Sequence, residues 1–105
     1  MRTWLTLTAA LSLTVPTFAD ATPDGAPIYK KSCAMCHGPD GKGRTAVGKS
    51  MKVRDLTSPE VQKLSDAQLH TVIADGKGKM PGYKSSLSDA QIKALVVTIR
   101  DLARK

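Results

Sequence analysis

Two cysteines and the histidine that follows them, Cys33, Cys36 and His37, form the most chemically specific group of residues in the chain. The spacing Cys-x-x-Cys-His is typical of a site where haem is attached covalently. Two thiols on one helical turn can each add to one haem vinyl group, and the next imidazole can then bind the iron from one face. We therefore interpret Cys33 and Cys36 as attachment residues and His37 as the proximal ligand.

Two other kinds of site use the same residue types. A zinc site needs about four protein ligands, and the only further histidine, His70, has a spacing that fits no ordinary zinc finger. A redox-active dithiol usually lies between a strand and a helix, and no strand pattern precedes Cys33. A count of free thiols or disulfides discriminates a thiol oxidoreductase from a haem protein.

The iron needs either a sixth ligand or an open face. Met35 lies between the two attachment cysteines, on the wrong side to reach over the ring. Met80 lies in a loop rich in glycine and lysine and is followed by Pro81, a setting in which a core-filling methionine has little purpose. We predict that Met80 is the second ligand, with Met51 as the alternative methionine. His70 lies beside the apolar stripe of its predicted helix, so we expect it at the surface.

The elements that must position these residues are predicted to be short helices. Each predicted helix begins after a residue able to cap its first turn; these caps are Asp24, Ser58, Ser65 and Ser88. The first helix runs from about Gly25 into the haem motif, and the last carries apolar residues at spacings of three and four. Residues 38–52 contain four glycines and are predicted to be a loop. No alternating strand pattern is present, so the predicted fold class is all-α.

The N-terminal residues have the layout of a secretory signal peptide. Arg2 supplies a positive charge, residues 5–15 are largely apolar, and Pro16 precedes small residues suited to cleavage after Ala19 or Ala21. The apolar run is shorter than the roughly 20 residues needed to span a bilayer. We therefore predict a signal peptide over residues 1–19 and an exported, periplasmic domain over residues 22–105, with no membrane span after cleavage.

The composition of the remaining chain indicates that it needs a cofactor to fold. Without residues 1–19 its only aromatic side chains are Tyr29 and Tyr83. Domains of this size bury too little apolar area to be stable without a disulfide, a metal or a large cofactor. Both cysteines belong to the haem motif, so no long-range disulfide is available.

The chain is basic, with a formal net charge of +7. No nucleic-acid partner is predicted, because the chain has the features of an exported protein with few aromatic residues and no recognition motif. Acidic redox proteins fit better, because opposite charge accelerates and orients their encounter. The candidate docking patch consists of lysines that neighbour the haem motif and the methionine loop in the sequence: Lys31, Lys77, Lys79 and Lys84.

From about residue 24 to residue 102 the sequence resembles the small soluble class I c-type cytochromes. The resemblance includes the haem motif, the glycine-rich segment after it, and Met80 followed by Pro81. It implies an all-α fold wrapped around one covalently bound haem c, and single-electron transfer as the activity. It also implies that Gly25 allows the first and last helices to approach closely, with Tyr29 packed beside Leu95.

The sequence departs from that family in three places. Thr98 stands where many members carry an aromatic residue in the last helix. The loop proline whose carbonyl often accepts the proximal imidazole proton in that family is not obvious here, and the nearest equivalent lies at residues 45–47. Some acceptor for the imidazole is expected, but which carbonyl orients His37 is left open by the sequence. With no tryptophan left after signal cleavage, Arg54 or a nearby lysine is the candidate contact for a haem propionate.

The function predicted from these features is that of a periplasmic monohaem electron carrier whose iron is held by His37 and Met80. An alternative is an electron-transfer subunit of a larger exported dehydrogenase or oxidase, which would show a persistent partner after gentle purification. A haem enzyme such as a peroxidase needs an open iron position, and Met80 argues against that.

Overall fold

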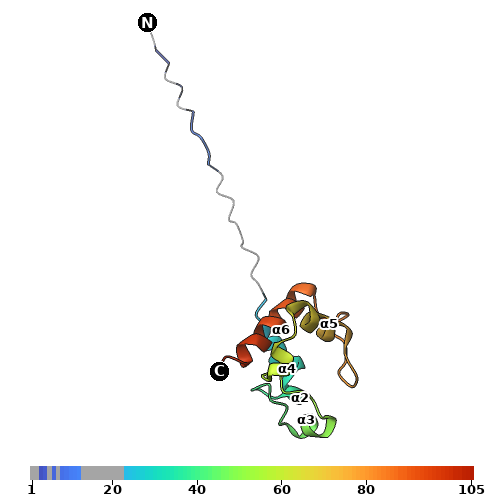
Figure 1. Ribbon diagram of the computed structural model, residues 1–105. Coiled ribbons are helices and arrows are strands. Elements are labelled where there is room, and N and C mark those ends of the chain that lie inside the picture. The colour runs from blue at the N-terminus through green and yellow to red at the C-terminus, as the bar shows by residue number, and fades with distance from the viewer. Residues whose placement is uncertain (1–2, 5, 7, 13–22) are drawn as a thin grey trace.

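The computed structural model describes residues 3–4, 6, 8–12 and 23–105 (Figure 1). Residues 23–105 form six α-helices and a single strand-like feature, an isolated backbone bridge between Lys77 and Met80. The helices are α1 (Gly25–Ser32), α2 (Ala34–His37), α3 (Ala46–Met51), α4 (Pro59–Gln62), α5 (Asp66–Asp75) and α6 (Asp89–Leu102). The all-α fold class predicted from the sequence is confirmed.

The predicted cleavage positions of the export signal, after Ala19 or Ala21, lie outside the residues that the structure describes. None of the helices in the described part of the chain combines the length and the apolar character needed to cross a bilayer.

The predicted caps begin four of these helices. The Asp24 carboxylate accepts a hydrogen bond from the Ala26 amide at 3.0 Å and starts α1. Ser58 caps α4, while Ser65 and Ser88 each form a reciprocal capping box with the glutamine three residues later. Each cap satisfies backbone groups that the first helical turn leaves without partners.

The prediction of an uninterrupted loop over residues 38–52 is wrong, because α3 lies within it. Thr45 caps this helix, its hydroxyl accepting from the Gly48 amide at 2.9 Å. Gly48 is unfavourable in a helix, but here it is buried, and an added Cβ would lie only 2.2 Å from the Cys36 carbonyl oxygen. The glycine allows α3 to lie against α2, and this packing favours the helix despite its composition.

The core is centred on the crossing of α1 and α6, which pack against each other (Figure 1). Tyr29 and Leu95 belong to one buried cluster, and Leu95 is only 1% exposed. An added Cβ on Gly25 would lie 2.3 Å from both the Ala94 carbonyl oxygen and Thr98 Oγ1. The crossing is therefore close at Gly25, and the small Thr98 side chain fits there while donating its own hydroxyl to Ala94.

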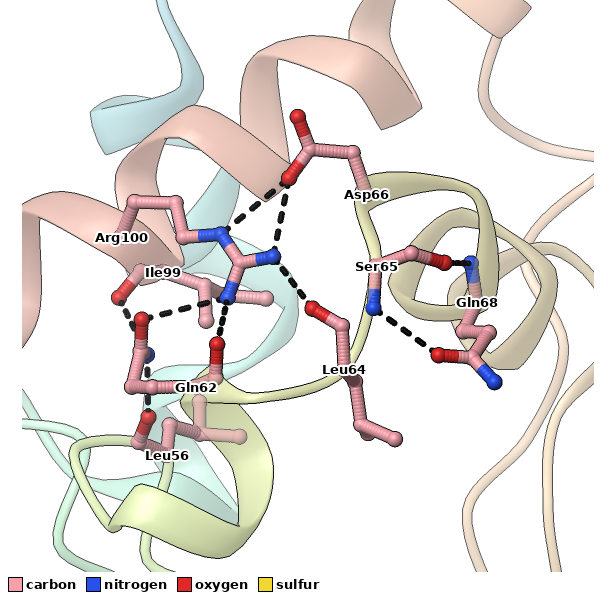
Figure 2. A network of polar contacts seen from close by, with 8 residues as sticks. All are labelled: Leu56, Gln62, Leu64, Ser65, Asp66, Gln68, Ile99 and Arg100. Carbon is pink, nitrogen blue, oxygen red and sulfur yellow. Dashed lines mark hydrogen bonds and ion pairs between the residues drawn. The ribbon is translucent and has the colours of Figure 1, made fainter.

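A second contact region joins the α4–α5 connection to α6 through Arg100 (Figure 2). The guanidinium donates to the Gln62 carbonyl at 2.9 Å, to the Leu64 carbonyl, and to one Asp66 oxygen at 2.9 and 3.1 Å. The Gln62 amide in turn donates to the Leu56 carbonyl at 2.7 Å. This network fixes the position of residues 56–66, and Leu56 and Leu64 of this segment line the cavity described below.

Replacing Gly25 by alanine is expected to lower the free energy of unfolding of the holoprotein. The added methyl group must displace backbone at Ala94, and overpacking of this kind costs about 1–3 kcal/mol. Denaturant unfolding followed by circular dichroism measures the change. Gly78→Ala is the control, since an added Cβ there meets no heavy atom within 4 Å and only its positive φ of 56° is unfavourable. Unchanged stability of Gly25→Ala would contradict the close crossing.

Candidate functional site

A cavity of about 860 Å³ lies between the helices and is lined mainly by apolar side chains. Cys33, Cys36 and His37 line it, as do Met51 and Met80. Much of the remaining wall comes from buried residues of α4, α5 and α6, among them Val61, Leu69, Ile73, Leu95 and Ile99. The structure therefore brings the predicted attachment and ligand residues to one cavity, although they lie far apart in the sequence.

The two cysteines lie on one helical turn, where the His37 amide donates to the Cys33 carbonyl at 3.0 Å. Burial, with a smaller contribution from Cys36, raises the pKa of the Cys33 thiol to about 11. A reactive dithiol needs a lowered pKa, so this environment does not favour a thiol oxidoreductase. The described residues also contain no cluster of three or more side chains suited to a zinc site.

His37 is oriented by a backbone carbonyl. Its Nδ1 lies 3.1 Å from the Arg54 carbonyl oxygen, and because a carbonyl can only accept, Nδ1 carries the proton. This leaves the Nε2 lone pair free for a metal. Burial lowers the pKa of His37, with the Arg54 hydrogen bond opposing that shift, and so favours the neutral imidazole that a metal requires.

The sequence left open which carbonyl orients His37, with residues 45–47 as the nearest equivalent. In the structure residues 46–51 form α3, and the carbonyl beside the imidazole is that of Arg54. The Val53 amide donates to the Gly48 carbonyl at 3.0 Å, which turns the chain back after the helix. Arg54 also lines the cavity with Lys52, so its predicted contact with a propionate stays a prediction.

Met80 reaches the cavity from a loop closed at its base. Lys77 and Met80 exchange two backbone hydrogen bonds, of 3.1 and 3.0 Å, around the turn at residues 78–79. The Tyr83 amide then donates to the Ile73 carbonyl at 2.9 Å and returns the loop to α5. An added Cβ on Gly76 would lie 2.6 Å from the Met80 carbonyl oxygen, so only glycine permits this closure.

The other candidate ligands differ in their positions. Met51, at the end of α3, lines the same cavity as Met80, so the structure leaves it as an alternative. Met35 is 72% exposed and is not part of the cavity wall. His70 is also outside that wall, and its Nε2 lies 2.8 Å from an Asp89 carboxylate oxygen at the surface. The expected surface position of His70 is confirmed.

Two tyrosine hydroxyls contribute to the site in a way the sequence did not indicate. Tyr29 donates to the Gly38 carbonyl at 2.6 Å, and Tyr83 donates to the Ser32 carbonyl at 3.0 Å. Burial is the main cause that raises the pKa of both phenols, which therefore stay protonated donors. Tyr83 thus joins the base of the methionine loop to the residue before Cys33, across 51 positions in the sequence.

The residues of this cavity fit the haem that the motif implies. The cysteines and His37 offer two thiols and one imidazole from one short segment, while the rest of the wall is mainly apolar and includes the thioethers of Met51 and Met80. Haem is a large, flat and mostly apolar group, so a cavity of this composition suits it better than a small polar ligand.

Comparison with known proteins identifies the family. A model described as cytochrome c oxidase, cbb3-type, subunit III, matches residues 20–97. The cbb3-type cytochrome c oxidase subunit CcoP of Azospirillum brasilense is 35% identical over 82% of this chain, which spans only 30% of that relative. Cytochrome c6 of a Synechococcus species is 31% identical over 98% of this chain and 88% of its own. Cytochrome c6 of Leptolyngbya boryana is 32% identical over 83% of this chain and 98% of its own.

A solved structure agrees with these relatives. The KustC0563 c-type cytochrome superposes with a TM-score of 0.71 at 33% sequence identity, covering 76% of this chain and 98% of its own. Fold, attachment motif and relatives lead to one conclusion. The chain belongs to the c-type cytochromes of the cbb3-type subunit III family, and it is a monohaem electron carrier with covalently bound haem c rather than an enzyme.

Proposed function

We propose that this protein is a periplasmic single-electron carrier whose iron is held by His37 and Met80. The observation that supports this most strongly is that the two residues come from separate elements, α2 and the loop after α5, and line the same cavity. Met80 is favoured over Met51 because its loop is closed by backbone hydrogen bonds and by close glycine contacts. A loop held in this way can keep a sulfur in place without large rearrangement.

Haem iron supplies a ferric/ferrous couple that takes up and releases one electron. The chain holds the site in one geometry during that exchange. The Arg54 carbonyl orients His37, the apolar wall excludes water, and a methionine ligand favours the reduced state relative to a second histidine. With His37 and Met80 both holding the iron, no position would be left open for peroxide chemistry.

The carrier is proposed to act as a separate protein. The chain spans 88% and 98% of the two cytochromes c6 but only 30% of CcoP. A second candidate is an electron-transfer subunit of a larger exported complex, which the match to cbb3-type subunit III favours. A stable partner that co-purifies under gentle conditions would support the second candidate, and a monodisperse free protein supports the first.

Export is inferred from the signal-like residues at the N-terminus. The proposal therefore includes both a cleaved leader and covalent haem attachment through Cys33 and Cys36. Cell fractionation followed by mass measurement checks both, since the expected product begins after Ala19 or Ala21 and carries one haem.

Docking of acidic partners is proposed to involve Lys31, Lys77, Lys79 and Lys84. Lys77 and Lys79 contribute to the cavity wall, and all four residues are exposed. Lys84 also lies 3.3 Å from Asp75, but both side chains of this pair are largely exposed, and such pairs contribute little. The lysines around the methionine loop therefore remain available to attract an acidic surface.

Electron transfer to an acidic redox protein is expected to slow as ionic strength rises. A flavodoxin of negative net charge serves as the probe, with the second-order rate measured by stopped flow. Most of the loss should occur as the Debye length falls from about 30 Å at 0.01 M to about 10 Å at 0.1 M. Reversing the charges at Lys77, Lys79 and Lys84 to glutamate should lower the low-salt rate about tenfold or more and leave the potential nearly unchanged.

The matched control reverses three cations away from the loop, Lys63, Lys93 and Arg104. Both triple variants change the net charge equally, so a general charge effect would slow them equally. That result would contradict a localised patch.

A further inference from the structure

The loop of residues 76–87 carries Met80 from the end of α5 toward the start of α6. Its backbone is hydrogen-bonded to α5: the Tyr83 amide donates to the Ile73 carbonyl at 2.9 Å, and the next amide makes the equivalent bond at 3.1 Å. These bonds set where the loop meets α5. They do not set how closely the loop approaches the opposite side of the cavity, where the cysteines lie.

The Tyr83 side chain makes the contact that the backbone of this loop lacks. Its hydroxyl donates to the Ser32 carbonyl at 3.0 Å, and Ser32 is the last residue of α1, immediately before Cys33. Within the residues that the structure describes, no other hydrogen bond joins this loop to α1 or α2. The phenol therefore connects the methionine side of the cavity with the segment that carries the attachment cysteines.

Both ends of this hydrogen bond lie at the cavity. Tyr83 and Ser32 line its wall together with Met80, and Tyr83 and Met80 are both partly buried and packed against the core. A methionine side chain has three rotatable bonds, so its sulfur is held in place only as well as the backbone that carries it. A rigid phenol ring three residues further along the chain limits where that backbone can lie.

We infer that Tyr83 is a positioning residue for the proposed axial ligand. Its hydrogen bond to Ser32 keeps the loop against the cysteine-bearing segment and so retains the Met80 sulfur at the iron. The inference rests on the proposed ligation by Met80 and adds what maintains it. Without this bond the loop keeps its attachment to α5 but opens more often on the side of the cysteines.

Tyr29 offers a matched comparison on the histidine side of the cavity. Its hydroxyl also donates to a backbone carbonyl, that of Gly38 at 2.6 Å, directly after His37. Tyr29 is only 5% exposed and is more deeply buried than Tyr83. Replacing either tyrosine by phenylalanine removes one hydroxyl and leaves the ring. Both changes should lower the free energy of unfolding, because each leaves a carbonyl without its phenol partner, but only Tyr83→Phe releases the loop.

Imidazole binding to the ferric holoprotein tests the inference, because imidazole competes with the sulfur and its apparent affinity follows the population in which the sulfur is displaced. Loss of the weak band at about 700 nm measures this affinity, and denaturant unfolding measures the global stability of the same variants. Tyr83→Phe should bind imidazole about two- to tenfold more tightly than the wild type, which is the range that one hydrogen bond supports. Tyr29→Phe should change the affinity much less, although its stability falls by as much or more.

The same titration in a Met80→Ala background, followed in the main haem absorption band, locates the effect. With no sulfur to displace, adding Tyr83→Phe should no longer change the imidazole affinity. An undiminished effect there would overturn the inference, as would equal tightening by Tyr83→Phe and Tyr29→Phe or no tightening by Tyr83→Phe. A band at about 700 nm that survives Met80→Ala would instead contradict the proposed ligation itself, and the inference would fall with it.

Discussion

Replacing Cys33 and Cys36 together by alanine is expected to yield a protein that loses all its haem to acid acetone, whereas the wild type keeps its haem. The thioether bonds are the only covalent links available, because the chain has no other cysteine. The two single variants are the controls, and each should retain one thioether. Haem that is extractable from the wild type would contradict the assignment of these cysteines.

The apoprotein of the double variant is expected to lack stable tertiary structure. Without haem the mainly apolar wall of the cavity would be exposed to water. A domain of this size buries too little other apolar area to offset that loss. Near-ultraviolet circular dichroism and denaturant titration measure the loss. A cooperative unfolding transition like that of the holoprotein would show that the helices do not need the cofactor.

Met80→Ala is expected to abolish the weak ferric absorption at about 700 nm that accompanies sulfur–iron ligation. The potential should fall by an amount on the order of 0.1 V, within the about 0.8 V range that axial ligands cover. Carbon monoxide should then bind the ferrous protein at neutral pH. Met51→Ala is the decisive comparison, because Met51 lines the same cavity, and Met35→Ala is the control at an exposed position. Loss of the band in Met51→Ala but not in Met80→Ala would transfer the ligand role to Met51.

The sequence was sufficient for the starts of four helices, which depend on neighbouring residues, although the local cap of α3 at Thr45 was missed. The caps at Ser65 and Ser88 form through side chains three positions away, and the apolar face of α6 follows from regular spacing. The close approach at Gly25 was expected only through the resemblance to a known family, and the structure gives its contacts with Ala94 and Thr98.

Contacts between distant segments were not predictable in the same way. The loop predicted over residues 38–52 contains α3 because Gly48 packs on Cys36, a tertiary contact that composition does not reveal. The carbonyl that orients His37 belongs to Arg54, 17 positions along the chain. The hydrogen bond from Tyr83 to Ser32 spans 51 positions. Each depends on how the chain returns to the cavity, which no local pattern records.

The optical spectrum of the intact protein, produced with c-type haem maturation, tests the central claim most directly, because it reports cofactor, linkage and axial ligands together. The expected result is a low-spin haem spectrum that survives acid-acetone extraction, with the weak ferric band at about 700 nm. Extractable haem would contradict covalent attachment through Cys33 and Cys36, and a high-spin ferric spectrum without that band would contradict ligation by His37 and Met80.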